Sequence, residues 1–385
     1  MFPFILLGRV IAIIKPLKAE YRAFYFFPFY HTGGAEKIHI QLTKATGGKD
    51  CIIFFTRKSE QAHYLEAFKE TGCTIRDISA YTDNKWLYFL NLIWRGRLSG
   101  YINKQKNTPI VFNGQCNLAY KISPWINHDV PQIELIHALN TFSWIRIPFL
   151  PFYNASVTVS DEIIAKHKTL YAPLHVPEKY FGHFKPVFSR VPLPPRGGKK
   201  DYQKNPLTVL YVGRTTPDKR HWLFARLAGQ MNNPEKYRFE MAGVEAAWVD
   251  APYLSAVFCH GDVRDEKKLY SIYDDAHILV IPSSTESGPL VFMEAMARGL
   301  AIVSTPVGYI PGHIRDGEEG FVCRELMDED KVLDEMTAFI NILENDRALL
   351  EKIGIHNTDR AYELYNIDSF NRDYLALFES FKTRN

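Results

Sequence analysis

The chain has 385 residues, of which 46% are hydrophobic and 14% aromatic, so two domains with sizeable cores are the natural expectation. The 46 Lys and Arg against 43 Asp and Glu leave a formal net charge of only +3, which excludes a protein that mainly neutralises a nucleic-acid backbone. The five cysteines form no CxxC pair, which argues against disulfide scaffolds and zinc ribbons and favours a cytoplasmic location.

Residues 1–22 begin with an apolar run that is too short to span a bilayer and is interrupted by Arg9. Basic residues follow the run at Lys15, Lys18 and Arg22. This order is the reverse of a secretory signal, and no small-residue cleavage site follows. Two interpretations remain open: a helix that lies on a membrane interface and makes peripheral contact, or a helix that covers the first sheet.

Short apolar runs then alternate with longer amphipathic segments, which is the pattern of βα units that build a parallel sheet. We predict a first α/β domain over residues 23–190. Its expected strands are Ala23–Pro28, Cys51–Phe55, Thr74–Asp77, Pro109–Phe112, Gln132–Ile136 and Ser156–Val159. Because open α/β sheets bind ligands beyond the carboxyl ends of their strands, residues just after these runs are candidates for substrate contact.

Two such candidates lie in the first domain. Gly33 and Gly34 join the first strand to a helix expected from Ala35, and paired glycines let the backbone come close to a ligand. A simple tight turn is the alternative. His137 follows a predicted strand and would point toward the edge of the sheet, although a buried structural histidine fits the same pattern.

At residues 191–205 the periodicity collapses into prolines, glycines and basic residues, the composition of a linker. A second α/β domain is expected over residues 206–366, followed by a helix in residues 367–385 that could pack back toward the first domain. The expected strands of the second domain are Leu207–Val212, Tyr237–Ala242, Ala256–Cys259, His277–Ile281 and Ala301–Ser304. Two α/β domains joined by one linker would leave a cleft between their facing strand ends.

The first strand of the second domain ends at Gly213 and releases Arg214 and Lys219 into the following loop. Arg offers a fork of donors to phosphate oxygens, and Lys adds a compact charge. We predict that this pair binds phosphate, with ordinary surface charge as the alternative.

Residues 281–299 form the most informative stretch of the chain. A strand, a loop of small residues and a helix that begins near Pro289 follow one another, and Gly299 suits the end of the helix. Free N–H groups and the helix dipole would favour an anion such as a diphosphate at the start of this helix. The backbone amides expected there belong to Gly288, Leu290 and Val291.

Two carboxylates flank this turn, Glu286 in the loop and Glu294 within the helix. Eight residues of helix rise about 12 Å, the scale of a ligand with a sugar at one end and a ribose at the other. Both carboxylates can accept hydrogen bonds from paired hydroxyls. The alternative is a solvated acid, which the apolar neighbours of Glu294 disfavour.

Signatures of other chemistries are missing. No Asp-x-Asp is placed to hold a divalent metal beside a diphosphate, and HExxH, GxSxG, GxGxxG and GxxxxGK[ST] do not occur. We therefore expect no metal and no other cofactor. Positive charge would come from Arg214, Lys219 and the helix N-terminus.

Several ordered motifs resemble the GT-B glycosyltransferases of family 4, the "glycosyl transferases group 1" family of retaining enzymes. They are Gly33–Lys37, Ala155–Ser160, Val212–Arg214 with Lys219, Phe258–Gly261, Pro282–Ser283, Glu286–Gly299 and Asp316–Gly320. The resemblance implies two Rossmann-like α/β domains that face each other across a cleft. It also implies transfer of a hexose from a UDP- or GDP-sugar to a hydroxyl of a glycan or lipid-linked glycan, in bacterial surface polysaccharide or glycolipid synthesis.

The resemblance further implies residue roles. Arg214 and Lys219 would neutralise the donor diphosphate, Glu286 would contact the donor sugar, and His137 would lie beside the transferred sugar, so these four are the expected catalytic residues. Glu294 would hold the ribose hydroxyls. The residues expected to bind the donor are Gly33, Gly34, Gly213, Val263, Gly288, Pro289, Leu290, Val291 and Glu294.

Two other classes of function remain open. A non-catalytic protein that binds sugar nucleotides or glycans could use the same scaffold, and it would release no nucleotide from a donor. A nicotinamide-dependent dehydrogenase would also have α/β domains, but its glycine fingerprint is missing here.

Overall fold

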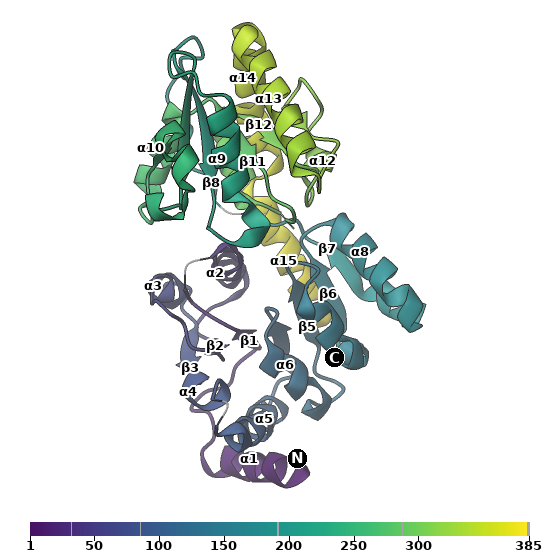
Figure 1. Ribbon diagram of the computed structural model, residues 1–385. Helices are drawn as coiled ribbons and strands as arrows, with labels where there is room; N and C mark the ends of the chain where they lie inside the picture. The colour runs from purple at the N-terminus through teal and green to yellow at the C-terminus, as the bar shows by residue number, and fades with distance from the viewer. Residues whose placement is uncertain (32, 85, 191, 287, 383–385) are drawn as a thin grey trace. The chain divides into compact units, whose positions relative to one another are not determined.

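The computed structural model describes residues 1–31, 33–84, 86–190, 192–286 and 288–382, which form two compact units. The first unit comprises Met1–Val191 and Asp368–Asn385, and the second comprises Pro192–Ile367. Each unit is a parallel sheet covered by helices (Figure 1). The proposed linker 191–205 therefore counts almost wholly with the second unit.

The sheet of the first unit has the strand order β3-β2-β1-β4-β5-β6-β7, and each of these neighbours pairs in parallel. Its strands are β1 Ala23–Phe27, β2 Cys51–Phe55, β3 Thr74–Asp77, β4 Ile110–Asn113, β5 Gln132–Ile136, β6 Ala155–Thr158 and β7 Phe184–Pro186. Its helices are α1 Phe2–Ile14, α2 Gly34–Thr46, α3 Leu65–Lys69, α4 Ser79–Thr82, α5 Tyr88–Asn103, α6 Asn117–Ile122, α7 Thr141–Ile145, α8 Asp161–Tyr171 and α15 Ile367–Lys382.

The second unit repeats this plan with the order β10-β9-β8-β11-β12-β13, again with parallel neighbours. Its strands are β8 Leu207–Val212, β9 Tyr237–Ala242, β10 Val257–Cys259, β11 Ile278–Ile281, β12 Ala301–Ser304 and β13 Gly320–Val322. Its helices are α9 His221–Gln230, α10 Glu266–Asp275, α11 Leu290–Ala297, α12 Ile310–His313, α13 Glu329–Asn345 and α14 Arg347–Leu364. In both sheets the chain starts in the middle, builds outward on one side and then returns to the other, so each has one point where the strand order reverses.

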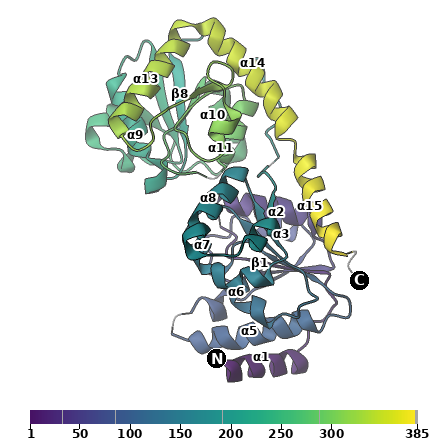
Figure 2. The ribbon, with the colours of Figure 1, turned by 90° about the vertical axis from the view of Figure 1, so that its right-hand side faces the viewer.

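The C-terminal helix α15 covers the sheet of the first unit (Figure 2). The ring of Phe378 stacks on Tyr25 and Phe112 with centroid distances of 6.0 Å in both cases, and the side-chain amide of Gln41 donates to Asn371 at 2.9 Å. These contacts join strands β1 and β4 and helix α2 to a helix more than 250 residues further along the chain.

All eleven strands expected from the sequence are present, with ends that differ by at most one residue. The strands β7 and β13 were not anticipated because neither contains an apolar run: β7 is Phe-Lys-Pro and β13 is Gly-Phe-Val. β13 starts at Gly320, where a Cβ atom would lie 1.9 Å from the carbonyl oxygen of Ile302. Close backbone pairing, rather than an apolar pattern, defines that strand.

Buried neutral histidines should make this fold acid-sensitive. Burial lowers the pKa of His137, His167 and His277 from 6.5 to about 4. Between pH 6.5 and about pH 4, the unfolded chain therefore binds more protons than the folded chain. Stability that is fully present above pH 6.5 is lost as the pH falls toward 4, by roughly 1.4 kcal/mol for each pKa unit.

We expect the urea midpoint of the full chain to fall continuously between pH 6.5 and 4. The His277→Gln variant should show a shallower fall, because one of the titrating groups is gone. Substitution of the exposed His128 by Gln is the matched control and should leave the slope unchanged. A wild-type midpoint that is constant over this interval would contradict the assignment.

Candidate functional site

Three of the predicted residues of the second unit, Arg214, Lys219 and Glu286, lie in the two loops that follow the strands where its strand order reverses. β8 and β11 are adjacent parallel strands, and the chain leaves them toward opposite edges of the sheet. Open α/β sheets bind ligands at the carboxyl ends of the strands at this position. The loop after β8 carries Arg214 and Lys219, and the loop after β11 carries Glu286.

Lys219 and Glu286 form an ion pair that joins these two loops. The Lys219 Nζ atom lies 2.5 Å from Glu286 Oε1, and the two side chains are 22% and 9% exposed. The Ser283 hydroxyl donates to the same carboxylate oxygen at 2.9 Å. The structure thus brings together two of the expected catalytic residues, which are 67 positions apart in the chain.

Arg220, which the sequence analysis passed over, fixes the position of the loop after β11. The residue is 4% exposed, and its guanidinium donates to the carbonyl oxygens of Pro282 at 2.6 Å, Ser283 at 3.0 Å and Leu326 at 2.8 Å. Its backbone is left-handed, with a φ of 47°. The adjacent Lys219 marked this loop as positively charged. The neighbouring sequence does not, however, distinguish a buried arginine from an exposed one.

Further hydrogen bonds connect the same loops. The Ser284 amide donates to the Asp218 carbonyl at 2.8 Å, so the backbones of the two loops are joined directly. The Thr305 hydroxyl, which follows β12, donates to the Ser283 carbonyl at 2.6 Å. The loops after β8, β11 and β12 are therefore held as one assembly.

We expect the Arg220→Met variant to lose at least about 2 kcal/mol of unfolding free energy, because three buried carbonyl groups lose a charged donor. Urea unfolding measures the loss. Arg214→Met is the matched control: Arg214 is exposed and should change the unfolding free energy by less than about 0.5 kcal/mol. Equal stability of the Arg220 variant and wild type would contradict this role.

Arg214 lies at the end of β8 and is exposed, and it forms no ion pair with any residue that the structure describes. Its backbone carbonyl accepts a hydrogen bond from the Tyr211 hydroxyl at 3.1 Å. Gly213 packs under the same ring, since a Cβ atom there would lie 2.7 Å from the Tyr211 hydroxyl oxygen. The cation thus projects from a tightly packed turn.

The start of α11 differs slightly from the expectation. Pro289 is the N-cap residue, with extended backbone, and Leu290 and Val291 begin the helix, so Pro289 is not inside the first turn. No side-chain hydrogen bond caps the helix at this residue. Gly288 packs on Tyr309, where a Cβ atom would lie 2.4 Å from a ring carbon, and the neighbouring Ser287 is outside the described residues.

Glu294 is buried inside the second unit at 4% exposure. The Tyr273 hydroxyl, from α10, donates to its carboxylate at 3.1 Å. Gly299 follows the C-cap residue of α11 and has a φ of 71°, which suits the helix end expected there. Val263 lies after β10 and packs partly buried against a core cluster that includes Leu279.

In the first unit, the glycine pair forms the start of α2. Gly33 is the N-cap residue in extended conformation, and Gly34 is the first helical residue. A Cβ atom on Gly33 would lie 2.2 Å from a carboxylate oxygen of Glu36, which is itself 5% exposed. Thr32, between His31 and Gly33, is outside the described residues. The absence of a side chain at Gly33 thus admits the Glu36 carboxylate.

His137 follows β5 and pairs with a second histidine that the sequence analysis missed. The Nε2 atoms of His137 and His39 are 3.0 Å apart, so one ring donates and the other accepts. His39, on α2, is 1% exposed and stacks on Phe27 at a centroid distance of 4.2 Å. Burial lowers the pKa of both rings, which keeps them neutral near pH 7. The feature of the sequence that could have identified His39 is its position among the apolar residues of α2.

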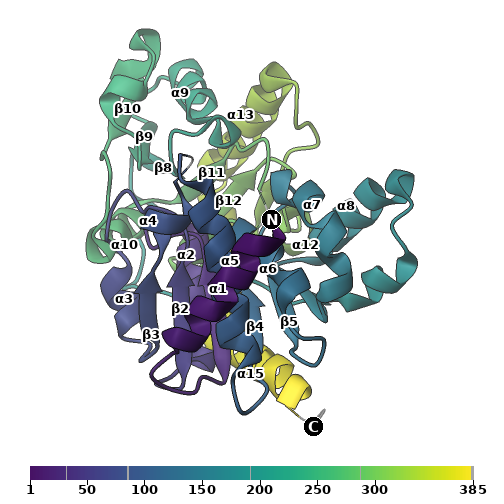
Figure 3. The same cartoon turned by 90° about the horizontal axis from the view of Figure 1, so that it is seen from below.

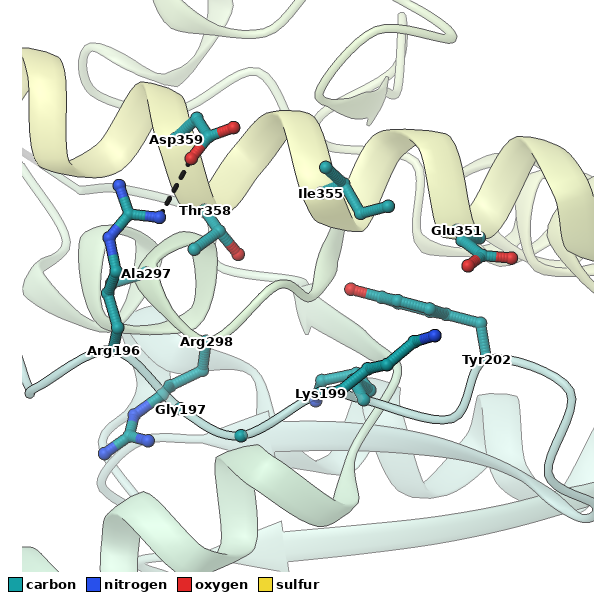
Figure 4. Close-up of a pocket in the computed structure, with 12 residues that line it drawn as sticks. Arg196, Gly197, Lys199, Tyr202, Ala297, Arg298, Glu351, Ile355, Thr358 and Asp359 are labelled. Atoms are coloured by element: carbon teal, nitrogen blue, oxygen red, sulfur yellow. Dashed lines mark hydrogen bonds and ion pairs between the residues drawn. The ribbon is translucent and has the colours of Figure 1, made fainter.

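A pocket in the second unit lies near the linker and α14 (Figure 4). None of the predicted site residues lines it. Two of its cations are already paired, Arg196 with Asp359 at 2.9 Å and Arg298 with Asp274 at 3.0 Å. These pairs hold the linker segment and α10 to the neighbouring helices.

The chain contains one Asp-x-Asp triplet, Asp328-Glu329-Asp330, at the start of α13. Asp328 caps α13 by accepting from the Lys331 amide at 3.3 Å, and Asp330 pairs with Arg226 at 2.6 Å. The triplet therefore has a structural role at the start of that helix.

A group with metal-ligand chemistry is formed by Glu318, Glu319 and His356. The Glu319 carboxylate already accepts from Arg315 at 2.8 Å and lies 3.1 Å from His356 Nε2. Glu319 is thus part of an ion-pair network that joins the loop before β13 to α14.

Residues 206–342 match the model of the family described as glycosyl transferases group 1. The D-inositol 3-phosphate glycosyltransferase of Corynebacterium diphtheriae is 42% identical over 59 residues, which are 15% of this chain and 14% of that relative. An uncharacterized 41.2 kDa protein in the cps region of Klebsiella pneumoniae is 27% identical over 153 residues, 36% of this chain and 38% of that protein.

Among solved structures, Anabaena Alr3699/HepE in complex with UDP and glucose matches with a TM-score of 0.73 at 12% identity. The match covers 94% of this chain and 100% of that chain. The chain therefore has the two Rossmann-like α/β domains of the GT-B fold, and the predicted fold class is confirmed. The cleft between facing domains stays a prediction.

Proposed function

We propose that this chain is a glycosyltransferase that moves a hexose from a nucleotide-sugar donor to a hydroxyl acceptor with retention of configuration. The observation that carries the proposal is the Lys219–Glu286 pair, with the exposed Arg214 on the same loop, at the strand reversal of the second sheet. The family match over residues 206–342 supports sugar transfer. The UDP and glucose in the structure of Alr3699/HepE support a UDP-sugar as the donor, with GDP-sugars as the other candidates.

In this proposal the donor diphosphate lies against Arg214, Lys219 and the uncapped start of α11. As the bond between sugar and phosphate breaks, negative charge accumulates on the phosphate, and preorganised cations and N–H groups stabilise it. Glu286 holds Lys219 in place and presents its second oxygen to the sugar. The acceptor hydroxyl attacks from the face that the phosphate leaves and passes its proton to an oxygen of the departing diphosphate; retention follows from the family resemblance.

The finer assignments belong to the same proposal. Glu294 would bind the ribose, with Tyr273 orienting its carboxylate. Gly33, Gly34 and His137 would approach the sugar from the first unit. The acceptor would be a glycan or lipid-linked glycan of bacterial surface polysaccharide or glycolipid synthesis, which the relative in the cps region supports. The reaction would take place in the cytoplasm and need no metal ion.

The test is release of nucleotide from a panel of UDP- and GDP-sugars by the full chain, in the presence of EDTA. We expect one donor to yield free nucleoside diphosphate, faster when a suitable glycan acceptor is added. Binding without release, for every donor and acceptor tried, would favour a non-catalytic sugar-nucleotide-binding protein. Activity that EDTA abolishes and Mg²⁺ restores would overturn the metal-free mechanism.

A further inference from the structure

The N-terminal helix α1 packs against α5 through small residues (Figure 3). A Cβ atom on Gly8 would lie 2.0 Å from the Ile93 carbonyl oxygen, and one on Gly96 would lie 2.0 Å from the Ile5 carbonyl oxygen. A Cβ atom on Gly100 would lie 2.9 Å from the Ala12 methyl group. The two helix backbones are therefore in direct contact, in the small-xxx-small pattern that is common between helices in lipid.

This packing turns the large apolar side chains of α1 outward. The buried residues of α1 are Ile5, Gly8 and Ala12. The exposed ones, with their exposed fractions, are Phe2 63%, Phe4 39%, Leu6 53%, Leu7 47%, Val10 41%, Ile13 57% and Ile14 70%. A helix that faces water would instead bury its large apolar side chains, because burying one such side chain is worth roughly 1.5–3 kcal/mol.

A second apolar group lies beside this helix, at the start of α5. Its exposed residues are Trp86 95%, Leu87 40%, Tyr88 51% and Phe89 44%. The rings of Phe4 and Phe89 are 6.5 Å apart, so the two groups are continuous. Trp and Tyr are the aromatic residues that concentrate at membrane–water interfaces.

Within residues 1–19 and 86–106 all charges are positive, and the exposed Glu20 and Asp83 flank these segments. Residues 1–19 and 86–106 contain no Asp or Glu. Their cations are Arg9, Lys15, Lys18, Arg95, Arg97, Lys104 and Lys106. Four of these, Lys15, Lys18, Lys104 and Lys106, are exposed. Such residues contribute about 1 kcal/mol each beside anionic lipid headgroups.

The length of α1 decides how it would meet a bilayer. Its 13 residues rise about 20 Å, against a hydrocarbon core of about 30 Å. No helix among the described residues has the length and apolar character that crossing a membrane requires. A short helix with a lipid-like face lies in the plane of the interface instead.

We infer that the outward face of α1, together with residues 86–89, docks the protein onto an anionic lipid bilayer. A second copy of the chain is a poor occupant of this surface, because the exposed lysines beside it, such as Lys15 and Lys18, would repel those of the other copy. The inference concerns the first unit and does not depend on the proposed transfer reaction. It would place a lipid-linked acceptor and the enzyme on the same surface.

The test is flotation of the full chain with vesicles of phosphatidylcholine alone and of phosphatidylcholine with 30% phosphatidylglycerol. We expect binding to the anionic vesicles, weaker binding to neutral ones, and weakening by salt. The double variant Leu6→Glu/Ile13→Glu should bind the anionic vesicles at least tenfold more weakly. Its matched control is Ile342→Glu/Ile355→Glu, which places the same charges on exposed apolar residues of the second unit and should bind like wild type.

Circular dichroism establishes that each variant is folded, and a Trp86→Phe variant should lose part of the fluorescence blue shift that vesicles induce. Wild-type protein that stays with the unbound fraction would overturn the inference. Flotation of the Leu6→Glu/Ile13→Glu variant at the wild-type level would overturn it as well. A wild-type dimer in light scattering that this variant abolishes, without any vesicle binding, would assign the surface to a second copy instead.

Discussion

Replacing Lys219 by Ala should lower turnover by about 10²–10³-fold, the cost of removing one preorganised group that stabilises developing negative charge. The effect should fall mainly on kcat, because the charge on the phosphate grows as the bond to the sugar breaks. Arg214→Ala should act in the same direction. Steady-state kinetics with the donor identified by the panel measure both.

The controls separate chemistry from folding. Lys236→Ala removes an exposed lysine of the same unit and should leave turnover unchanged. Lys219→Ala also leaves the Glu286 carboxylate without its cation, so the urea midpoint of each variant is measured beside its rate. A folded Arg214→Ala/Lys219→Ala double variant that turns over within threefold of wild type would reject the assignment.

Replacing Arg146 by Met should cost about 3–5 kcal/mol of unfolding free energy, because it strands a buried carboxylate. Arg146 is 1% exposed and Glu134 0%. The Arg146 guanidinium donates to the Glu134 carboxylate at 3.0 Å and to the Ser156 hydroxyl at 2.8 Å. The Tyr120 hydroxyl donates to the Glu134 carboxylate at 2.8 Å. Glu134 is in β5, the strand that leads to His137.

Two comparisons sharpen this result. The double variant Glu134→Leu/Arg146→Met removes both charges and should recover much of the lost stability, since the desolvation cost goes with them. Lys69→Met breaks an exposed pair with Glu66 and should change the unfolding free energy by less than about 1 kcal/mol. If the Arg146 and Lys69 variants lose the same stability, the buried pair does not have this role.

The sheets could be predicted from sequence because their central strands are buried on both faces. Such strands appear as continuous apolar runs, as in Cys51–Phe55, and their burial in parallel sheets explains the pattern. The strand order could not be read from these runs, because periodicity carries no information about which strands are neighbours. The position of the reversal between β8 and β11 therefore came only from the structure.

The candidate site, like the fold, could be predicted from the sequence only in part. Residues that follow a strand, such as Lys219 and Glu286, could be selected one at a time, but their contact across 67 positions could not. Arg220 and His39 were missed because their importance comes from burial among groups distant in sequence. Local sequence reports which residues carry charge, whereas tertiary packing decides which charges are held in place.

We propose that Arg214, Lys219 and the start of α11 bind a diphosphate without a metal ion. Calorimetry in EDTA tests this proposal most directly. Titrating the full chain with UDP, GDP and the corresponding monophosphates should show one diphosphate that binds, its monophosphate at least tenfold weaker, and no binding by the folded Arg214→Ala/Lys219→Ala variant. Equal binding of that diphosphate by wild type and double variant, or no binding of either diphosphate by wild type, would contradict the claim.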